Sequence, residues 1–130
     1  PETILVRMKD KIQFRKGSIG IDEINVQVFD RLVKMLRENN WNILVEGHAE
    51  VGESYEKDKS VDAYQLSSMR ALQVSKALIQ RGVAPSRVTT VFYGDSRPQE
   101  KANPNISDRR VEFVLKKNDL RTEGRKVEGR

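Results

Sequence analysis

Short stretches of apolar or alternating residues mark the strands that we expect in this chain. Residues 4–6 and 12–14 are two short candidates near its start. A further strand is expected over residues 41–48, whose apolar run at 43–45 is typical of a strand that is buried on both faces. Residues 88–93 are rich in β-branched and aromatic side chains, and apolar and polar positions alternate over 110–116. These patterns predict a sheet of four main strands.

Two stretches instead repeat their apolar residues every three to four positions, as an amphipathic helix does. The first is 23–38, which Asp22 can cap and which Asn39 and Asn40 should end, since asparagine tolerates the left-handed backbone that closes helices. The second is about 64–81, followed by Gly82 in the usual stop position.

The element order is therefore strand, helix, strand, helix, strand, strand. Right-handed crossovers place both helices on the same side of the sheet. The sequence predicts an α/β (α+β) sandwich with two main helices on one face of a mixed four-stranded sheet. We expect the domain to span 12–117, with 1–11 as an extension or extra strand and 118–130 as a polar, disordered tail. A long polar loop covers 51–63.

Composition narrows the possible functions. The 130 residues are 37% hydrophobic and 33% charged, and no apolar run approaches the roughly 20 residues of a membrane helix. The net charge is +5, but the basic residues are scattered among acids and aromatics are few, so we expect no nucleic-acid partner. There is no cysteine, which excludes disulfides and thiol chemistry. The chain starts at Pro1 without a leader, so we expect it to be a piece of a longer protein.

Arg70 is the most informative single residue, because it lies on or beside the apolar stripe of the second helix, four positions from both Leu66 and Val74. One interpretation is an arginine whose stem covers the core while its head reaches water. The other is a planar fork aimed at a carboxylate, where two parallel hydrogen bonds give both energy and geometry.

Glu50 follows the 41–48 strand, at the kind of sheet edge where α/β proteins bind ligands. His48 is the only histidine, so a multi-histidine metal site is impossible and a hydrogen-bonded structural role is favoured. The chain has no nucleophile elbow, phosphate-binding loop or HExxH motif. We therefore expect no enzyme activity, no cofactor and no metal.

At these residues the chain resembles the OmpA-like (OmpA/MotB C-terminal) domain family. The resemblance rests on ILVEGHAE at 43–50, LSSMRA at 66–71 and DRRVE at 108–112, in that order. It implies a periplasmic, non-catalytic module that anchors an envelope protein to peptidoglycan through the diaminopimelate of the stem peptide. By resemblance, Arg70 grips a ligand carboxylate and Glu50 holds the ligand ammonium. The family also implies attachment to the outer or inner membrane through a missing part, possible envelope protein partners and a possible homodimer.

Several positions depart from the family pattern, and the 51–63 loop is longer than usual. Glu50 replaces an aspartate, Ala49 a threonine, Ala63 an asparagine and Asp108 another asparagine. A second hypothesis is therefore an OmpA-like domain with a degenerate ligand site that serves as a structural or protein-interaction module, with Glu50 or Asp108 tied up in internal ion pairs. The expected ligand-binding residues are Glu50, Arg70, His48, Ala49, Ala63, Asp108 and Arg110.

Overall fold

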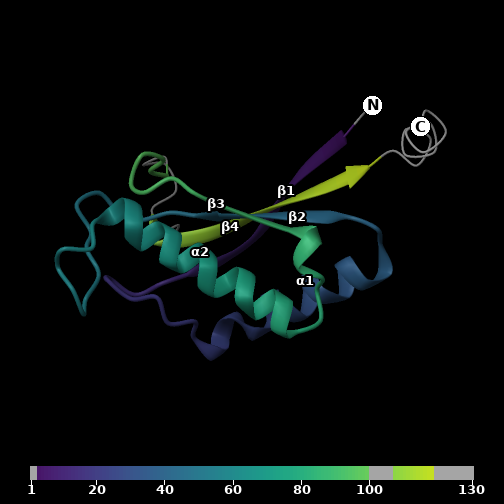
Figure 1. Ribbon diagram of the computed structural model, residues 1–130, viewed down its shortest axis with the longest axis horizontal. Helices are drawn as coiled ribbons and strands as arrows, with labels where there is room; N and C mark the ends of the chain where they lie inside the picture. The colour runs from purple at the N-terminus through teal and green to yellow at the C-terminus, as the bar shows by residue number, and fades with distance from the viewer. Residues whose placement is uncertain (1–2, 100–106, 119–130) are drawn as a thin grey trace.

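The computed structural model describes residues 3–99 and 107–118 (Figure 1). Two long helices lie over the same face of a four-stranded sheet (Figure 1). In chain order the elements are β1 (Thr3–Gln13), the short 3-10 helix η1 (Glu23–Asn25), α1 (Val26–Glu38), β2 (Asn42–Gly47), α2 (Ala63–Gln80), the 3-10 helix η2 (Pro85–Arg87), β3 (Val88–Phe92) and β4 (Arg110–Asn118).

The strands lie side by side in the order β1-β4-β2-β3. β4 is antiparallel to both of its neighbours, whereas β2 and β3 are parallel and are connected through α2. A parallel pair needs such a crossover, because a short turn cannot return the chain to the same end of the sheet. The predicted sandwich of two helices on one face of a mixed four-stranded sheet is confirmed.

The start of the chain differs from the prediction of two short strands. A single strand, β1, runs from Thr3 to Gln13 along β4, with a register shift between Arg7 and Lys11. This irregularity interrupts the alternation of apolar residues, so the sequence pattern looked like two separate segments. β1 passes residue 12, the expected start of the domain, without a break. Our division of the chain into parts stays a prediction, and most of the expected tail (119–130) lies outside the described residues.

Two expected helix ends also differ. The Asp22 side chain makes no capping hydrogen bond to η1 and instead accepts one from Arg15. At the end of α1, Asn39 is extended rather than left-handed, and its side-chain amide donates to the Met35 carbonyl at 3.0 Å. The carbonyl is thus satisfied by a side chain, and no left-handed residue is needed there. Gly82 does take a left-handed φ of +103° after α2, as predicted.

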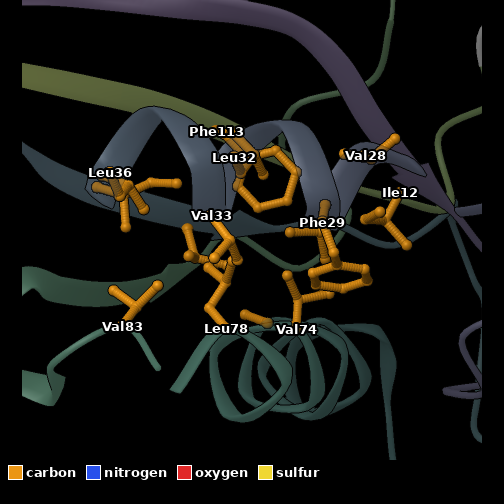
Figure 2. Close-up of a cluster of buried hydrophobic side chains, with 14 of the residues drawn as sticks. Ile12, Val28, Phe29, Leu32, Val33, Leu36, Val74, Leu78, Val83 and Phe113 are labelled. Atoms are coloured by element: carbon orange, nitrogen blue, oxygen red, sulfur yellow. The ribbon is translucent and has the colours of Figure 1, made fainter. Parts of the chain in front are cut away.

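The hydrophobic core fills the space between the helices and the sheet, as Figure 2 shows. α1 contributes the buried Phe29 and Leu32, α2 contributes Val74 and Leu78, and β4 contributes Phe113. Alternate residues of β4 face this core, as the sequence pattern predicted. The core anchors α2 along most of its length and so fixes the position of the candidate site at its first turns.

Gly47, the last residue of β2, allows α2 to pack directly on the sheet. A Cβ atom at this position would lie 2.1 Å from the Ser67 carbonyl oxygen and 2.8 Å from the Ala71 Cβ. No side chain fits there. This close approach brings Arg70, on the same helix, next to the point where β2 ends. The helix itself begins at Asp62, whose carboxylate accepts a hydrogen bond from the Gln65 backbone N–H at 2.9 Å.

Candidate functional site

Arg70 is the largest fully buried side chain of the described residues, with 0% of its surface exposed. Its Nε donates to the Ser18 carbonyl at 2.9 Å, and its Nη1 donates to the His48 carbonyl at 3.3 Å. The guanidinium lies over the Phe14 ring, 5.2 Å from the ring centroid. The interpretation in which the Arg70 guanidinium reaches water is therefore wrong. The guanidinium instead faces a carboxylate, as in the other interpretation.

That carboxylate belongs to Glu53, which the sequence analysis did not single out. Arg70 Nη1 donates to Glu53 Oε1 at 2.8 Å and Nη2 donates to Oε2 at 2.5 Å, so the pair is bidentate. Two backbone N–H groups complete the surroundings, with Gly17 N at 2.7 Å from Oε2 and Glu50 N at 2.9 Å from Oε1. The Glu53 side chain is 0% exposed. Four donors therefore surround one buried carboxylate.

The ionised form of Glu53 is the stable one in this environment. Burial alone would raise the pKa of Glu53, but the hydrogen bonds from Arg70, Glu50 and Gly17 and the charge of Arg70 lower it more, so the net pKa lies below its usual value. A buried ion pair is tolerated only when its remaining hydrogen-bonding groups are satisfied, and here they are.

Glu50 lies at the rim above this pair, where β2 has ended. Its side chain is 39% exposed, and Oε1 accepts a hydrogen bond from Arg109 Nη1 at 3.3 Å. Arg109 also donates from Nε to the Phe14 carbonyl at 2.9 Å. Glu50 and Arg70 are brought together through Glu53, since the Glu50 backbone and the Arg70 guanidinium bind the same carboxylate oxygen. The Glu50 backbone therefore lies beside Arg70, but the acid that contacts Arg70 is Glu53, and the Glu50 carboxylate pairs with Arg109 instead.

A groove of about 420 Å³ opens beside Arg109. Its walls come from the end of β1, from η1 and from the segment before β4, and they include Lys11, Phe14, Arg15, Asp22, Ile24, Asn25 and Arg109. Ile24 is 85% exposed on this rim. The groove therefore offers cations, an acid and an apolar surface close to Glu50.

His48 lies on the opposite face of the sheet from α2 and does not join the Arg70 site through its ring. The side chain is 4% exposed, packs on the Tyr93 ring at 5.3 Å, and neither ring nitrogen has a hydrogen-bond partner among the described residues. Burial, together with the positive charge of Arg110, lowers the pKa of His48 to about 4. The hydrogen-bonded structural role is wrong for the ring; only the His48 carbonyl takes part in the site.

Asp108 and Arg110 also lie away from the Arg70 pocket. Asp108 accepts a hydrogen bond from the Gln99 backbone at 2.6 Å and lies 3.8 Å from Arg110, whose Nε donates to Glu112 at 2.5 Å. Glu112 in turn pairs with Arg7 at 3.1 Å. Asp108 therefore pairs internally, but with neither Arg70 nor Arg109.

The two alanines among the expected site residues are buried parts of the scaffold. The Ala49 backbone N–H donates to the Gly94 carbonyl at 2.8 Å, which holds the loop after β3 against the site. Ala63 is the first residue of α2, and the capping function that an asparagine would supply there comes from Asp62. Neither alanine side chain offers a polar contact to a ligand.

Sequence reasoning missed Glu53 and Arg109. Arg109 was visible as one of a pair of arginines before β4, but no pattern linked it to Glu50. Glu53 was one of several acids in a polar loop, and its inward position depends on a turn in which the Glu53 N–H donates to the Glu50 carbonyl. Across 3–99 and 107–118, no three acidic or histidine residues gather in a way that could hold a metal ion, and neither described helix is long and apolar enough to cross a bilayer.

The class of protein that this fold and site define is an OmpA-like domain, and comparison with known proteins agrees. The chain belongs to the OmpA family, whose model matches residues 13–112. Domains of this family are non-catalytic modules, as we expected for this chain.

Individual relatives give the same fold. The C-terminal domain of Helicobacter pylori MotB is 26% identical, with a TM-score of 0.70 over 89% of this chain and 91% of that domain. The peptidoglycan-associated lipoprotein of Burkholderia pseudomallei is 21% identical, with a TM-score of 0.67 over 82% and 90%. Outer membrane porin F of Pseudomonas fluorescens is 56% identical over 39 residues, which is 28% of this chain and 12% of the porin.

Proposed function

We propose that this domain is a non-catalytic peptidoglycan-binding module of a periplasmic cell envelope protein. Membership of the OmpA family supports this, as does the likeness to a peptidoglycan-associated lipoprotein and to MotB. One observation carries the proposal. A buried arginine of α2, Arg70, binds a carboxylate through two parallel hydrogen bonds beside the end of β2, and the backbone of an exposed acid, Glu50, binds the same carboxylate.

The ligand that fits this pair of charges is the diaminopimelate of a stem peptide. Its side chain ends in an amino-acid group, which presents an ammonium and a carboxylate on one carbon. Glu50 would hold the ammonium and Arg70 the carboxylate, since charge-assisted and bidentate hydrogen bonds are the strong ones in such sites. The peptide backbone and sugar would extend over the groove beside Arg109.

A second candidate function is favoured by specific observations. Arg70 already has a carboxylate partner in Glu53, and Glu50 is paired with Arg109. These internal pairs are what we expect of an OmpA-like domain whose ligand site has changed and which serves as a structural or protein-interaction module of the envelope. Attachment of such a module to a membrane, or its pairing with a second copy, belongs to this hypothesis as well.

A titration of the ¹⁵N-labelled domain with a stem tripeptide that ends in diaminopimelate separates the two candidates. The peptidoglycan-binding function predicts saturable amide shifts at Glu50, Gly17 and the start of α2. Glu50→Gln removes the acid that faces the ligand ammonium, so it should weaken binding by about tenfold or more, since truncating one partner of a charge pair costs about 2 kcal/mol or more.

Glu56→Gln is the matched control, because Glu56 is an exposed acid of the same loop whose carboxylate makes no hydrogen bond or ion pair among the described residues. It should bind like the wild type. Absence of shifts at millimolar peptide, with a folded spectrum, would contradict the binding function and favour the structural module.

A further inference from the structure

We propose that Glu53 is an internal ligand of this domain: its carboxylate fills the receptor that Arg70 forms for the carboxylate of a bound stem peptide. This inference rests on the proposed function and concerns the regulation of the same site. A bound ligand and Glu53 would then compete for one guanidinium, and Glu53 determines how tightly the domain binds.

The receptor around Arg70 has the geometry of a carboxylate-binding site. Arg70 supplies two parallel N–H donors, and Gly17 and Glu50 supply two backbone N–H donors, all within 2.9 Å of a Glu53 oxygen. A carboxylate has about four acceptor positions, so these donors saturate it. Gly17 reaches the carboxylate from a left-handed backbone with φ of +70°. The same four donors would serve a free carboxylate of any origin.

While Glu53 is in place, no N–H group of Arg70 is left to bind another carboxylate. The three other N–H groups of Arg70 are bound to backbone carbonyls: Nε donates to Ser18 at 2.9 Å, Nη1 to His48 at 3.3 Å and Nη2 to Arg15 at 3.4 Å. Both side chains are fully buried, so no ligand reaches the guanidinium from solvent. A ligand carboxylate can bind Arg70 only after Glu53 has left.

The way in which Glu53 is held also favours such an exchange. The loop that carries it has little apolar anchoring, since Val51 is 70% exposed and residues 56–60 are all exposed. Its backbone contacts to the rest of the domain include a hydrogen bond from Glu56 N to the Gly17 carbonyl at 2.9 Å and one from Gly52 N to an Asp95 carboxylate oxygen at 3.2 Å. Segments with few buried apolar contacts open at low free-energy cost. Glu53 is therefore held mainly by the four hydrogen bonds that a ligand would replace.

The consequence for binding follows from mass action. A ligand that binds only the form without Glu53 in the pocket has its apparent affinity reduced by the fraction of molecules in that form. Glu50 is already exposed while Glu53 is in the pocket, so its carboxylate can meet the ligand ammonium first. The domain should thus select ligands that carry both charges, because a ligand with an ammonium alone cannot replace the Glu53 carboxylate on Arg70.

The inference can be tested with acetate, which matches the group that a truncation of Glu53 removes. Glu53→Ala deletes a CH₂ and a carboxylate, which together correspond to one acetate ion. The variant should melt at a lower temperature than the wild type in sodium chloride, because Arg70 is left buried without an acid. Sodium acetate, raised from 1 to 300 mM at constant ionic strength, should raise its melting temperature by about 5 °C or more.

Three comparisons make this result specific. The wild type and Glu53→Gln, whose amide fills the same space, should show no such acetate dependence. The double variant Glu53→Ala/Arg70→Met should also show none, because the guanidinium is absent. If Glu53→Ala is unfolded in chloride, circular dichroism should show that acetate refolds it.

An unchanged melting temperature of Glu53→Ala over the whole acetate range would overturn the inference. An acetate effect of equal size in the double variant would overturn it as well. Because no peptidoglycan is used, failure of this test is distinct from failure of the proposed function: the wild type could still bind a stem peptide through Glu50 alone. Support for the inference would also predict that Glu53→Ala binds the stem tripeptide about tenfold or more tighter than the wild type in chloride.

Discussion

Replacing Arg70 by methionine removes the cation from a fully buried ion pair and leaves the Glu53 carboxylate with only two backbone donors. Breaking a buried pair in this way costs about 3–5 kcal/mol, because the remaining charge is uncompensated. The Ser18 and His48 carbonyls lose a donor as well. With a urea m-value of about 1–3 kcal/mol/M, the unfolding midpoint should fall by about 2 M.

Urea denaturation of a double-mutant cycle measures the coupling itself. Arg70→Met, Glu53→Gln and the double variant are compared with the wild type, and the double variant should be less destabilised than the sum of the single variants by about 2 kcal/mol. The control is the Arg31–Asp10 pair, which has similar bidentate geometry but lies at the surface. Arg31→Gln should leave the midpoint nearly unchanged.

Two results would refute this reasoning. An Arg70→Met variant as stable as the wild type would mean that Glu53 finds water or another partner when the cation is absent. Strict additivity of the two substitutions would mean that the pair contributes no coupling, and that each residue stabilises the fold through other contacts.

Three further outcomes are expected. Gly47→Ala should destabilise the domain by about 3 kcal/mol in urea unfolding, because the new Cβ would meet the Ser67 carbonyl at 2.1 Å and force α2 away from β2; a loss below about 1 kcal/mol would contradict this packing. Ser67→Ala should cost about 1–3 kcal/mol, since the buried Gly94 N–H loses the Ser67 hydroxyl as its acceptor at 2.8 Å; a neutral variant would show that this N–H has another acceptor. Between pH 6.5 and 4 the wild type should lose stability as the pH falls, by roughly 3 kcal/mol through His48, because the unfolded histidine binds a proton in this window and the folded one, with its pKa lowered to about 4, does not. The melting temperature of His48→Phe should depend less on pH over the same range. A pH dependence equal to that of the wild type would exclude His48 as its cause.

The general fold could be predicted because it depends on repeated patterns. The stripe of α1 and the alternation in β4 each involve many residues, so a single irregular position does not obscure them. β1 shows the limit of this approach. Its register shift near Arg7 and Lys11 breaks the alternation, and a continuous strand therefore looked like two.

Arg70 could be predicted as a site residue because a charged side chain on an apolar stripe must find a partner. Its partner could not be predicted. Glu53 is one acid among several in the 51–63 loop, and its position depends on how the turn after Glu50 folds against Gly17. That is tertiary information, which neither periodicity nor residue spacing contains. For the same reason, the sequence could not predict that the ring nitrogens of His48 lack a hydrogen-bond partner within residues 3–99 and 107–118.

The measurement that tests the account most directly compares two stem peptides that differ at one position. The side chain of a C-terminal diaminopimelate carries an ammonium and a carboxylate on one carbon, whereas the side chain of the corresponding lysine peptide carries the ammonium alone; both peptides keep the same C-terminal carboxylate. Isothermal titration of the wild-type domain with each should show binding of the diaminopimelate peptide that is at least tenfold tighter, since only this peptide can replace Glu53 on Arg70. Equal affinities, or no binding of either peptide, would contradict a peptidoglycan site built on Glu50 and Arg70.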